Sequence, residues 1–366
     1  MLDILASFSL PRRLRGPRRA GAAPVPPRTA RVAFGAPAAC HLRHAMAVGT
    51  TVVAVLAAAA PLTAQAADAY PSKPIHLVVG FPPGGSNDIV ARLLAPKLGQ
   101  ILGTSVVVEN RAGANAIIGT DYVARAAPDG YTITLGSASP LAISPHTYSN
   151  MPFDPVKDLT AITTVAATPE LIAINPKLPA KNLQELVALA KKQDITLASS
   201  GNGGLPHLAI ELLKIASKGR IVHVPYKGAG PATTDAVGGH VDGIIMDLPA
   251  LYSMVSENKL RPLAVTDNHR APVLPAVPTS VEDGLPTVLA FNWFAVMAPA
   301  KTPAPVVDKL YQALVQTVND GEVKASLAKL GIEPYTQASP QAFSAFLKTE
   351  LTRWGEVARA SGAKAD

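Results

Sequence analysis

Short apolar runs alternate with helix-length amphipathic segments along most of the chain, from Tyr70 to about residue 360. In the first round, the run from Ile75 to Phe81 has the length of a buried strand. Residues 87–100 then place Ile89, Val90, Leu93, Leu94 and Leu98 on one face of a helix. Repeated rounds of this kind predict βαβ units around mostly parallel sheets, so the expected fold class is α/β.

The same pattern predicts the remaining elements. Further strands are expected at 105–109, 131–135, 195–198, 221–224, 243–246, 263–266, 290–297 and, briefly, 333–336. Helices are expected at 117–126, 183–192, 206–216, 232–237, 251–257, 303–318, 323–330 and 340–360. An apolar stretch at 162–174 precedes a second block of alternation, whose first helix we expect Asn182 or a neighbour to cap. The Pro-rich residues 272–286 are expected to form a loop. The terminal helices are expected to pack against the first of two lobes, the one that contains the first strands and helices.

The composition is that of a globular protein. Of 366 residues, 48% are hydrophobic and 16% are charged, and a chain of this length holds two lobes of ordinary size. The formal net charge of +7 comes from residues 1–66, which carry eight arginines and one acid, Asp3. After residue 66, 25 basic residues balance 25 acidic ones. The charge therefore gives no support for a nucleic-acid partner.

Residues 1–66 have the layout of an export signal. Arg43 and His44 precede an apolar stretch at 45–60, and Ala64-Gln65-Ala66 offers a cleavage site of small residues. We expect cleavage after Ala66 and a periplasmic mature protein. A membrane anchor is the alternative, but the stretch is short for a span that needs about 20 residues. Met46 is a second candidate start, so the start codon stays open.

The single cysteine, Cys40, precedes the apolar stretch, whereas a lipoprotein cysteine would follow it. The absence of cysteine after residue 66 excludes disulfides, thiolate metal sites and cysteine nucleophiles from the expected mature chain. Such a protein must be stabilised by its core alone.

The most informative motif is a glycine turn between the first strand and the first helix, Phe81-Pro82-Pro83-Gly84-Gly85-Ser86-Asn87-Asp88. Unpaired N–H groups and the positive end of the helix dipole meet there, so the turn suits an anion. The alternative is a tight turn in which Ser86 or Asn87 caps the helix. We expect Asp88 to cap the helix or to meet a cationic or hydroxyl group. A side chain at Gly85 is expected to block the ligand and to exclude the backbone angles of the turn.

A second turn of the same kind is Ser199-Ser200-Gly201-Asn202-Gly203-Gly204, which leads into a helix that carries His207 in its first turn. Two such loops on separate lobes would face each other across a cleft and surround a carboxylate with backbone donors. His207 and Glu211 have the spacing of a metal pair, but one histidine and one acid make no site without further ligands. We expect no metal and favour a histidine at a helix start.

A third turn, 224–231, adds a phenol and an ammonium group. Tyr226 is a candidate donor to an acidic ligand and Lys227 a candidate attractor, although a solvated loop charge is an equal alternative for Lys227. Two further strand ends, 136–139 and 246–249, join these turns at the carboxyl ends of strands, where α/β sheets bind ligands.

Enzyme motifs are missing from the sequence. It contains no G-x-S-x-G elbow, no G-x-G-x-x-G that opens a helix and no H-E-x-x-H. Ser200 and His207 are near in sequence, but nothing places an acid behind the histidine. A transferase or lyase that uses Lys227 is the next enzymatic alternative, and no specific feature supports it. We therefore expect no catalytic residue.

The chain resembles the Bug-type periplasmic receptors of tripartite tricarboxylate transporters from Tyr70 to Ala360. The resemblance rests on six ordered motifs: 70–75 (YPSKPI), 81–85 (FPPGG) with Asp88, 108–114 (VENRAGA), 128–132 (PDGYT), 200–201 with 207–209 (HLA), and 224–228 (VPYKG). It implies a type II periplasmic binding protein fold, with two lobes and a ligand cleft between them. Lobe one is expected at 67–166 plus 290–366 and lobe two at 167–289, after a presequence at 1–66.

The resemblance also implies a non-enzymatic, monomeric receptor without a cofactor. It would bind a small carboxylate, such as a di- or tricarboxylate, an acidic amino acid or an aromatic carboxylate, and deliver it to the membrane components of the transporter. The site residues that it implies are Phe81, Gly84, Gly85, Ser86, Asp88, Ser137, Ala138, Ser200, Gly201, Gly203, Tyr226, Lys227 and Gly228. The segment 202–206 departs from the family pattern and leaves the ligand's identity open. A sensor for a signalling partner, or an enzyme with an unrecognised site, stays an alternative.

Overall fold

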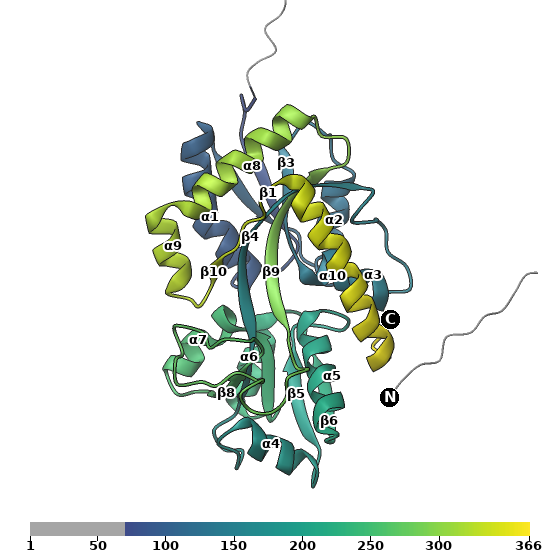
Figure 1. The fold of residues 1–366 in the computed structure, drawn as a ribbon, viewed down its shortest axis with the longest axis vertical. Coiled ribbons are helices and arrows are strands. Elements are labelled where there is room, and N and C mark those ends of the chain that lie inside the picture. The colour runs from purple at the N-terminus through teal and green to yellow at the C-terminus, as the bar shows by residue number, and fades with distance from the viewer. Residues whose placement is uncertain (1–69) are drawn as a thin grey trace, which may run out of the picture. The chain divides into compact units, whose positions relative to one another are not determined.

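The computed structural model describes residues 70–366, so the expected cleavage after Ala66, the start codon and Cys40 lie outside the described residues. Strands and helices alternate as the pattern predicts (Figure 1). The strands are β1 (Ile75–Val79), β2 (Val106–Asn110), β3 (Thr132–Ser137), β4 (Leu159–Ile174), β5 (Ile195–Ser199), β6 (Ile221–Pro225), β7 (Gly243–Asp247), β8 (Arg261–Val265), β9 (Phe291–Pro299) and β10 (Glu333–Pro334).

The helices differ from the expected ones by a few residues at their ends. They are α1 (Ser86–Leu102), α2 (Ile117–Ala124), α3 (Ser144–Thr147), α4 (Leu183–Ala190), α5 (Leu205–Ser217), α6 (Ala229–Gly238), α7 (Leu248–Ser256), α8 (Ala304–Asn319), α9 (Gly321–Ala328) and α10 (Pro340–Ser361), with a π-helical turn, η1 (Ser139–Ile143). As expected, Asn182 caps α4, where its Oδ1 accepts a hydrogen bond from the Glu185 N–H at 2.8 Å.

Three local features depart from the prediction. η1 and α3 were not expected, because each is too short to show a helical period in the sequence. The apolar stretch at 162–174 belongs to β4, a single strand of 16 residues. The α1 N-cap is Gly85, not Ser86 or Asn87, and no side chain caps that helix end.

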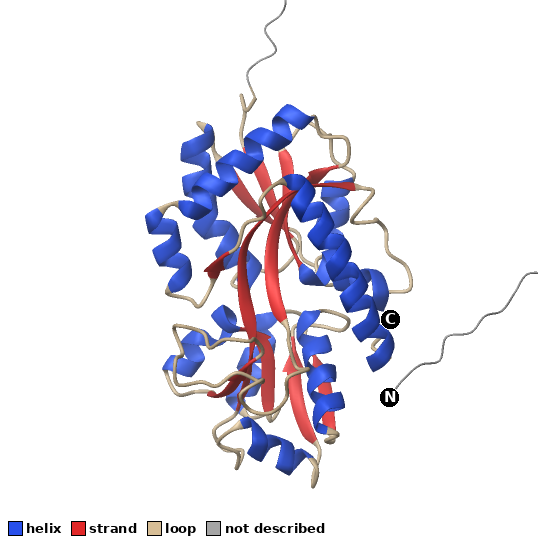
Figure 2. Ribbon diagram, viewed as in Figure 1, coloured by secondary structure: helices blue, strands red, loops and turns tan. Residues whose placement is uncertain are grey.

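All ten described strands join one curled sheet, and β4 is the strand shared by its two parts. The main order is β2-β1-β3-β9-β4-β7-β5-β6, while β10 and β8 also pair with β4. The strands β2-β1-β3 are parallel to one another, as are β6-β5-β7, and β4 and β9 run antiparallel to their neighbours. The carboxyl ends of β1 and β3 and those of β5, β6 and β7 therefore lead into the region between the two parts (Figures 1 and 2).

Each part of the sheet carries helices on its faces. In the part built on β1–β3, α8 and α9 pack against α1 and share a buried apolar core with β1, β3 and β9. In the other part, α6 and α7 pack beside β5 and β7 over a second core. No helix among the described residues is long and apolar enough to cross a membrane.

The terminal helix α10 reaches further than expected, since it packs against η1 and α3 and also against α5 in the other part of the sheet. A buried acid fixes it to β9. Glu350 Oε2 accepts hydrogen bonds from Trp293 Nε1 at 2.9 Å and from Trp354 Nε1 at 3.1 Å, and all three residues are buried. One carboxylate oxygen therefore satisfies two indole groups in the core.

We expect Glu350→Ala to lower the free energy of unfolding by about 2 to 4 kcal/mol, because it leaves two buried indole N–H groups without an acceptor. Urea unfolding at neutral pH measures the difference. Glu356, exposed on the same helix, is the matched control, and Glu356→Ala should change stability by less than about 0.5 kcal/mol. Equal effects of the two substitutions would contradict this role of Glu350.

Candidate ligand-binding site

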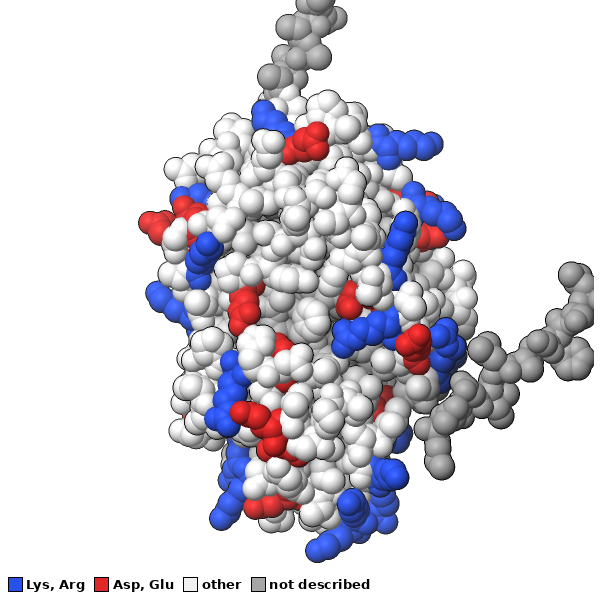
Figure 3. All heavy atoms as spheres, in the orientation of Figure 1, with Lys and Arg blue, Asp and Glu red and all other residues white. Residues whose placement is uncertain are grey.

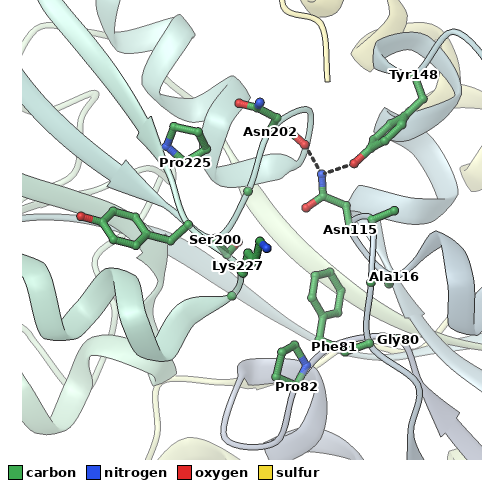
Figure 4. Close-up of a pocket in the computed structure, with 16 residues that line it drawn as sticks. Gly80, Phe81, Pro82, Asn115, Ala116, Tyr148, Ser200, Asn202, Pro225 and Lys227 are labelled. Atoms are coloured by element: carbon green, nitrogen blue, oxygen red, sulfur yellow. Dashed lines mark hydrogen bonds between the residues drawn. The ribbon is translucent and has the colours of Figure 1, made fainter. Parts of the chain in front are cut away.

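Two adjoining cavities lie where the strand ends of the two parts of the sheet meet. The larger, of about 560 Å³, is bordered by the loops after β1, β2, β5 and β6 (Figure 4). The smaller, of about 130 Å³, is bordered by the first turns of α1, α5, α6 and α7 together with η1 and β9. Five residues line both cavities: Phe81, Pro82, Ser200, Lys227 and Gly228. The two cavities therefore form one continuous candidate site.

The first glycine turn is held in place by Asp88. Its Oδ2 accepts a hydrogen bond from the Gly84 N–H at 3.0 Å, and its carboxylate also bonds Arg92 and the Asn110 side chain, each at 2.9 Å. Burial acts to raise the pKa of Asp88, but the hydrogen bonds from Arg92, Gly84 and Asn110 outweigh it and lower the pKa. Asp88 lines neither cavity. Of the two expected roles, Asp88 thus meets a cation and does not cap the helix, while it also fixes the Gly84 N–H of the turn.

The backbone of this turn offers free donors to the smaller cavity. No hydrogen bond of the described residues uses the N–H groups of Ser86 or Asn87, which lie in the first turn of α1 and line that cavity. The expectation about Gly85 was wrong in one respect. Gly85 has an ordinary φ of −80°, which other residues also adopt. The φ that favours glycine, +83°, belongs to Gly84. Gly85 lines the smaller cavity, so a side chain there would occupy ligand space.

The second glycine turn has most of its donors committed to protein partners. The Leu205 N–H donates to Ser139 Oγ at 3.0 Å, the Gly203 N–H donates to His207 Nδ1 at 2.9 Å, and the Gly203 carbonyl accepts from Thr147 Oγ1 at 2.9 Å. Gly203 lines neither cavity, whereas Ser200 and Gly201 line the larger one. This turn therefore faces the ligand space mainly through Ser200 and Gly201.

A stacked pair of histidines supports the second turn. The rings of His207 and His223 lie 3.9 Å apart, and His223 Nε2 is 2.5 Å from Ser199 Oγ. Burial lowers the pKa of His207 to about 4 and, together with the neighbouring His207, that of His223 to about 3. Because His207 Nδ1 accepts the Gly203 N–H, this imidazole is neutral and acts as an acceptor. No group of three or more metal-ligating side chains occurs among residues 70–366.

The third turn differs in detail from its expected role. The Tyr226 hydroxyl donates to Asp235 at 2.7 Å, and this bond raises the pKa of Tyr226 to about 12. The hydroxyl proton that was expected to bond a ligand is therefore committed to Asp235. Lys227 is exposed, lines both cavities and has no ion pair among the described residues. Gly228 has a φ of +106° and donates its N–H to the Ser200 carbonyl at 3.1 Å. This bond ties the second turn to the third.

The strand end after β3 reaches the site one residue later than expected. Ser137 and Ala138 are buried and line neither cavity, while the next residue, Ser139, lines the smaller one. The Ala138 N–H donates to Asn292 Oδ1 at 3.3 Å. Ser137 and Ala138 thus lie behind the wall that Ser139 forms.

Sequence reasoning did not select four polar residues that line the site. Asn115 and Tyr148 line the larger cavity, and Asp247 and Asn292 the smaller one. Asn115 Nδ2 donates to Tyr148 Oη at 3.2 Å and to the Asn202 carbonyl, so it bridges two loops (Figure 4). Three successive positive φ angles, at Ala114, Asn115 and Ala116, shape this loop. An asparagine within a glycine and alanine run was the available signal, because asparagine tolerates this backbone region.

The chain matches the tripartite tricarboxylate transporter family receptors over residues 90–363. Protein BugT of Bordetella pertussis is 38% identical over 327 residues, which are 88% of this chain and 99% of BugT. Similar solved structures include R. palustris Rpa4515 with adipate, which is 33% identical with a TM-score of 0.78 over 81% of this chain and 99% of that one. Periplasmic binding protein BugD is 36% identical, with a TM-score of 0.76 over 81% of this chain and 99% of that one. MatC (Rpa3494) from Rhodopseudomonas palustris with bound malate is 29% identical, with a TM-score of 0.74 over 79% of this chain and 99% of that one.

The fold is therefore that of the periplasmic solute-binding proteins, and the expected α/β class and type II binding fold are confirmed. The chain belongs to the tripartite tricarboxylate transporter receptor family, of which the Bug proteins are relatives. The resemblance that the six sequence motifs carry is thus confirmed. This is a family of solute-binding receptors.

The histidine pair makes the stability of this region depend on pH. The unfolded histidines titrate near 6.5, whereas the folded values are about 4 and about 3. As the pH falls from 6.5 toward 4, the unfolded state takes up protons that the folded state does not, so the free energy of unfolding falls. The loss is at most about 1.4 kcal/mol per pH unit for each histidine.

We expect the NMR signals of the His207 and His223 rings to stay those of neutral imidazole down to about pH 5. Urea unfolding at pH 7 and about pH 5 should show the accompanying loss of stability. Titration of either ring above about pH 6 would contradict this account.

Proposed function

We propose that this protein captures a small carboxylate in the two adjoining cavities and delivers it to the membrane components of a tripartite tricarboxylate-type transporter. The observation that carries the proposal is the meeting of four helix N-termini, those of α1, α5, α6 and α7, at the smaller cavity. Helix N-termini present N–H donors and partial positive charge, so they favour an anion. Similar proteins solved with adipate and malate support a carboxylate as that anion.

The residues at the boundary of the two cavities suit a carboxylate held mainly by the backbone. Ser86 and Asn87 bring free N–H groups from the smaller cavity, and Ser200 and Gly228 line both cavities. Lys227 adds one exposed positive charge. A donor aimed at a carboxylate forms a charge-assisted bond worth about 1.5 to 3 kcal/mol, so a few such bonds hold a small ligand.

Binding is proposed to involve closure of two lobes, residues 67–166 plus 290–366 and residues 167–289. The bonds of Asn115 to the Asn202 carbonyl, of Thr147 to Gly203 and of Ser139 to Leu205 each join one proposed lobe to the other. All three lie around the cavities. They are the contacts by which the closed protein would exclude water from the ligand.

The proposal includes export, cleavage near Ala66 and a monomeric receptor in the periplasm. The balanced charge after residue 66 fits a soluble ligand better than nucleic acid. On the face drawn in Figure 3, lysine and arginine are interspersed with acidic residues and form no single basic patch.

A receptor should bind its carboxylate with one ligand per protein and return it unchanged. Calorimetric titration of residues 67–366 against a panel of di- and tricarboxylates, acidic amino acids and aromatic carboxylates measures stoichiometry and affinity. Mass spectrometry of the recovered ligand tests turnover. A converted product would overturn the receptor function in favour of an enzyme, and the lack of any carboxylate binding would overturn the ligand class.

Backbone-led recognition predicts a ranking of two variants. Gly228→Ala places a methyl group 3.2 Å from Pro82 Cγ and at a φ of +106°, so we expect affinity to fall by about tenfold or more. Lys227→Ala should weaken binding by only about fivefold, and less at high salt, because the ammonium group is exposed.

Gly321→Ala is the control for the first variant, because its added methyl group meets no atom within 4 Å and Gly321 starts α9, away from the cavities. Titration of the three folded variants with the best ligand of the panel decides the ranking. If Lys227→Ala abolishes binding while Gly228→Ala binds normally, the side chain carries recognition and the backbone account is wrong.

A further inference from the structure

The smaller cavity contains an acidic side chain that the capture of a plain carboxylate does not use. Asp247 ends β7, lines this cavity and is buried. The Asn292 Nδ2 group donates to both of its carboxylate oxygens, at 3.0 and 3.1 Å. Each Asp247 oxygen accepts one hydrogen bond from Asn292 and no other among the described residues, so each keeps a lone pair free for a further donor.

A second buried acid stands behind Asp247. The antiparallel pairing of β4 with β7 sets Glu170 directly opposite Asp247, and Glu170 is fully buried. Burial raises the pKa of Glu170 well above its ordinary range, and the neighbouring Asp247 raises it further. Burial also raises the pKa of Asp247, against the opposing effect of the neighbouring polar groups of Glu170, Ser86 and Asn292. Asp247 is the member of this pair that faces the cavity, and its two oxygens are held by Asn292.

An unpartnered hydroxyl lies in the same cavity. Ser86 is 4% exposed and lines the smaller cavity, and its Oγ has no hydrogen-bond partner in the described part of the chain. A buried hydroxyl without a partner is unfavourable, and a ligand group is the natural partner. A hydroxyl both donates and accepts, so Ser86 can bond the same ligand group that donates to Asp247.

These groups distinguish between ligand chemistries. A second carboxylate of the ligand against Asp247 would place two negative charges together in a buried space. A hydroxyl or ammonium group would instead donate to Asp247, and a cavity of about 130 Å³ admits a substituent of that size. The ligand carboxylate then lies at the boundary of the two cavities, beside Ser200, Lys227 and Gly228.

We propose that Asp247 and Ser86 form a donor-recognising subsite, so that the receptor selects carboxylates bearing a hydroxyl or ammonium group over the unsubstituted acids. This inference rests on the proposed carboxylate-receptor function and narrows its ligand class. Asp247 is the specificity-determining residue, and Glu170 lies directly opposite it on β4.

Calorimetric titration with two matched series tests the subsite: succinate, each enantiomer of malate and aspartate, then glutarate, 2-hydroxyglutarate and glutamate. We expect at least one substituted acid to bind about tenfold tighter than the unsubstituted acid of its length, because a polar site rejects an analogue that lacks its donor. Equal affinities within both series would overturn the subsite. The lack of binding by any carboxylate would overturn the receptor function as well.

Asp247→Asn removes the charge with little change of shape. It should reduce the preference to less than about threefold, by weakening the substituted acid and strengthening the unsubstituted one. The matched control is Asp242→Asn, because Asp242 immediately precedes the other end of β7 and bonds Thr196 outside the cavities. It should leave the ratio of the two affinities unchanged. An Asp247→Asn protein that keeps the full preference would overturn the role of Asp247.

Ser86→Ala provides a second variant in case Asp247→Asn does not fold. It should lower the preference by about threefold or more, through the loss of one hydrogen bond to the substituent. A uniform weakening of substituted and unsubstituted acids alike would show that the cavity has only a structural role, and would also overturn the subsite.

Discussion

The antiparallel pairing of β4 with its neighbours is the interaction on which the rest of the structure depends. β4 pairs with β9 and β10 along its first part and with β7 and β8 along its second, so one strand of 16 residues belongs to both parts of the sheet. Because parallel strands on each side end at this crossing, their loops and the helices that follow converge there. The two cavities are a consequence of that convergence.

The candidate site combines a favourable field for anions with a buried acidic side chain. The first turns of four helices surround the smaller cavity, yet Asp247 lies among them with Glu170 behind it. A buried acid is tolerated there because the helix ends and the two hydrogen bonds from Asn292 stabilise it. A ligand therefore meets donors at the boundary and an acceptor at the end of the same space.

In the glycine turns, some polar groups are bonded within the protein and others stay free for a ligand. Asp88 holds the first turn from behind, and the His207 and His223 stack holds the second. Such supports leave the N–H groups of Ser86 and Asn87 free in the first turn, whereas the second turn uses several of its donors within the protein. Recognition is thus asymmetric, although the two turns look alike in sequence.

The sequence by itself determined the α/β class, the family, the place of most helices and strands, and the three glycine turns. These features depend on local periodicity and on turn chemistry, which neighbouring residues carry. It also offered a cation as a partner for Asp88, and Arg92 is that partner, whereas the helix cap that it offered as the other role was wrong.

Only the tertiary structure decided which polar residues meet. Glu170 and Asp247 are 77 positions apart in the numbering and become neighbours through strand register, and Asn292 joins them from β9. The Tyr226 hydroxyl bonds Asp235, and Asn115 bridges to Asn202. Contacts of this kind depend on how distant strands and loops pack against one another, and no pattern within one segment of the chain records that packing.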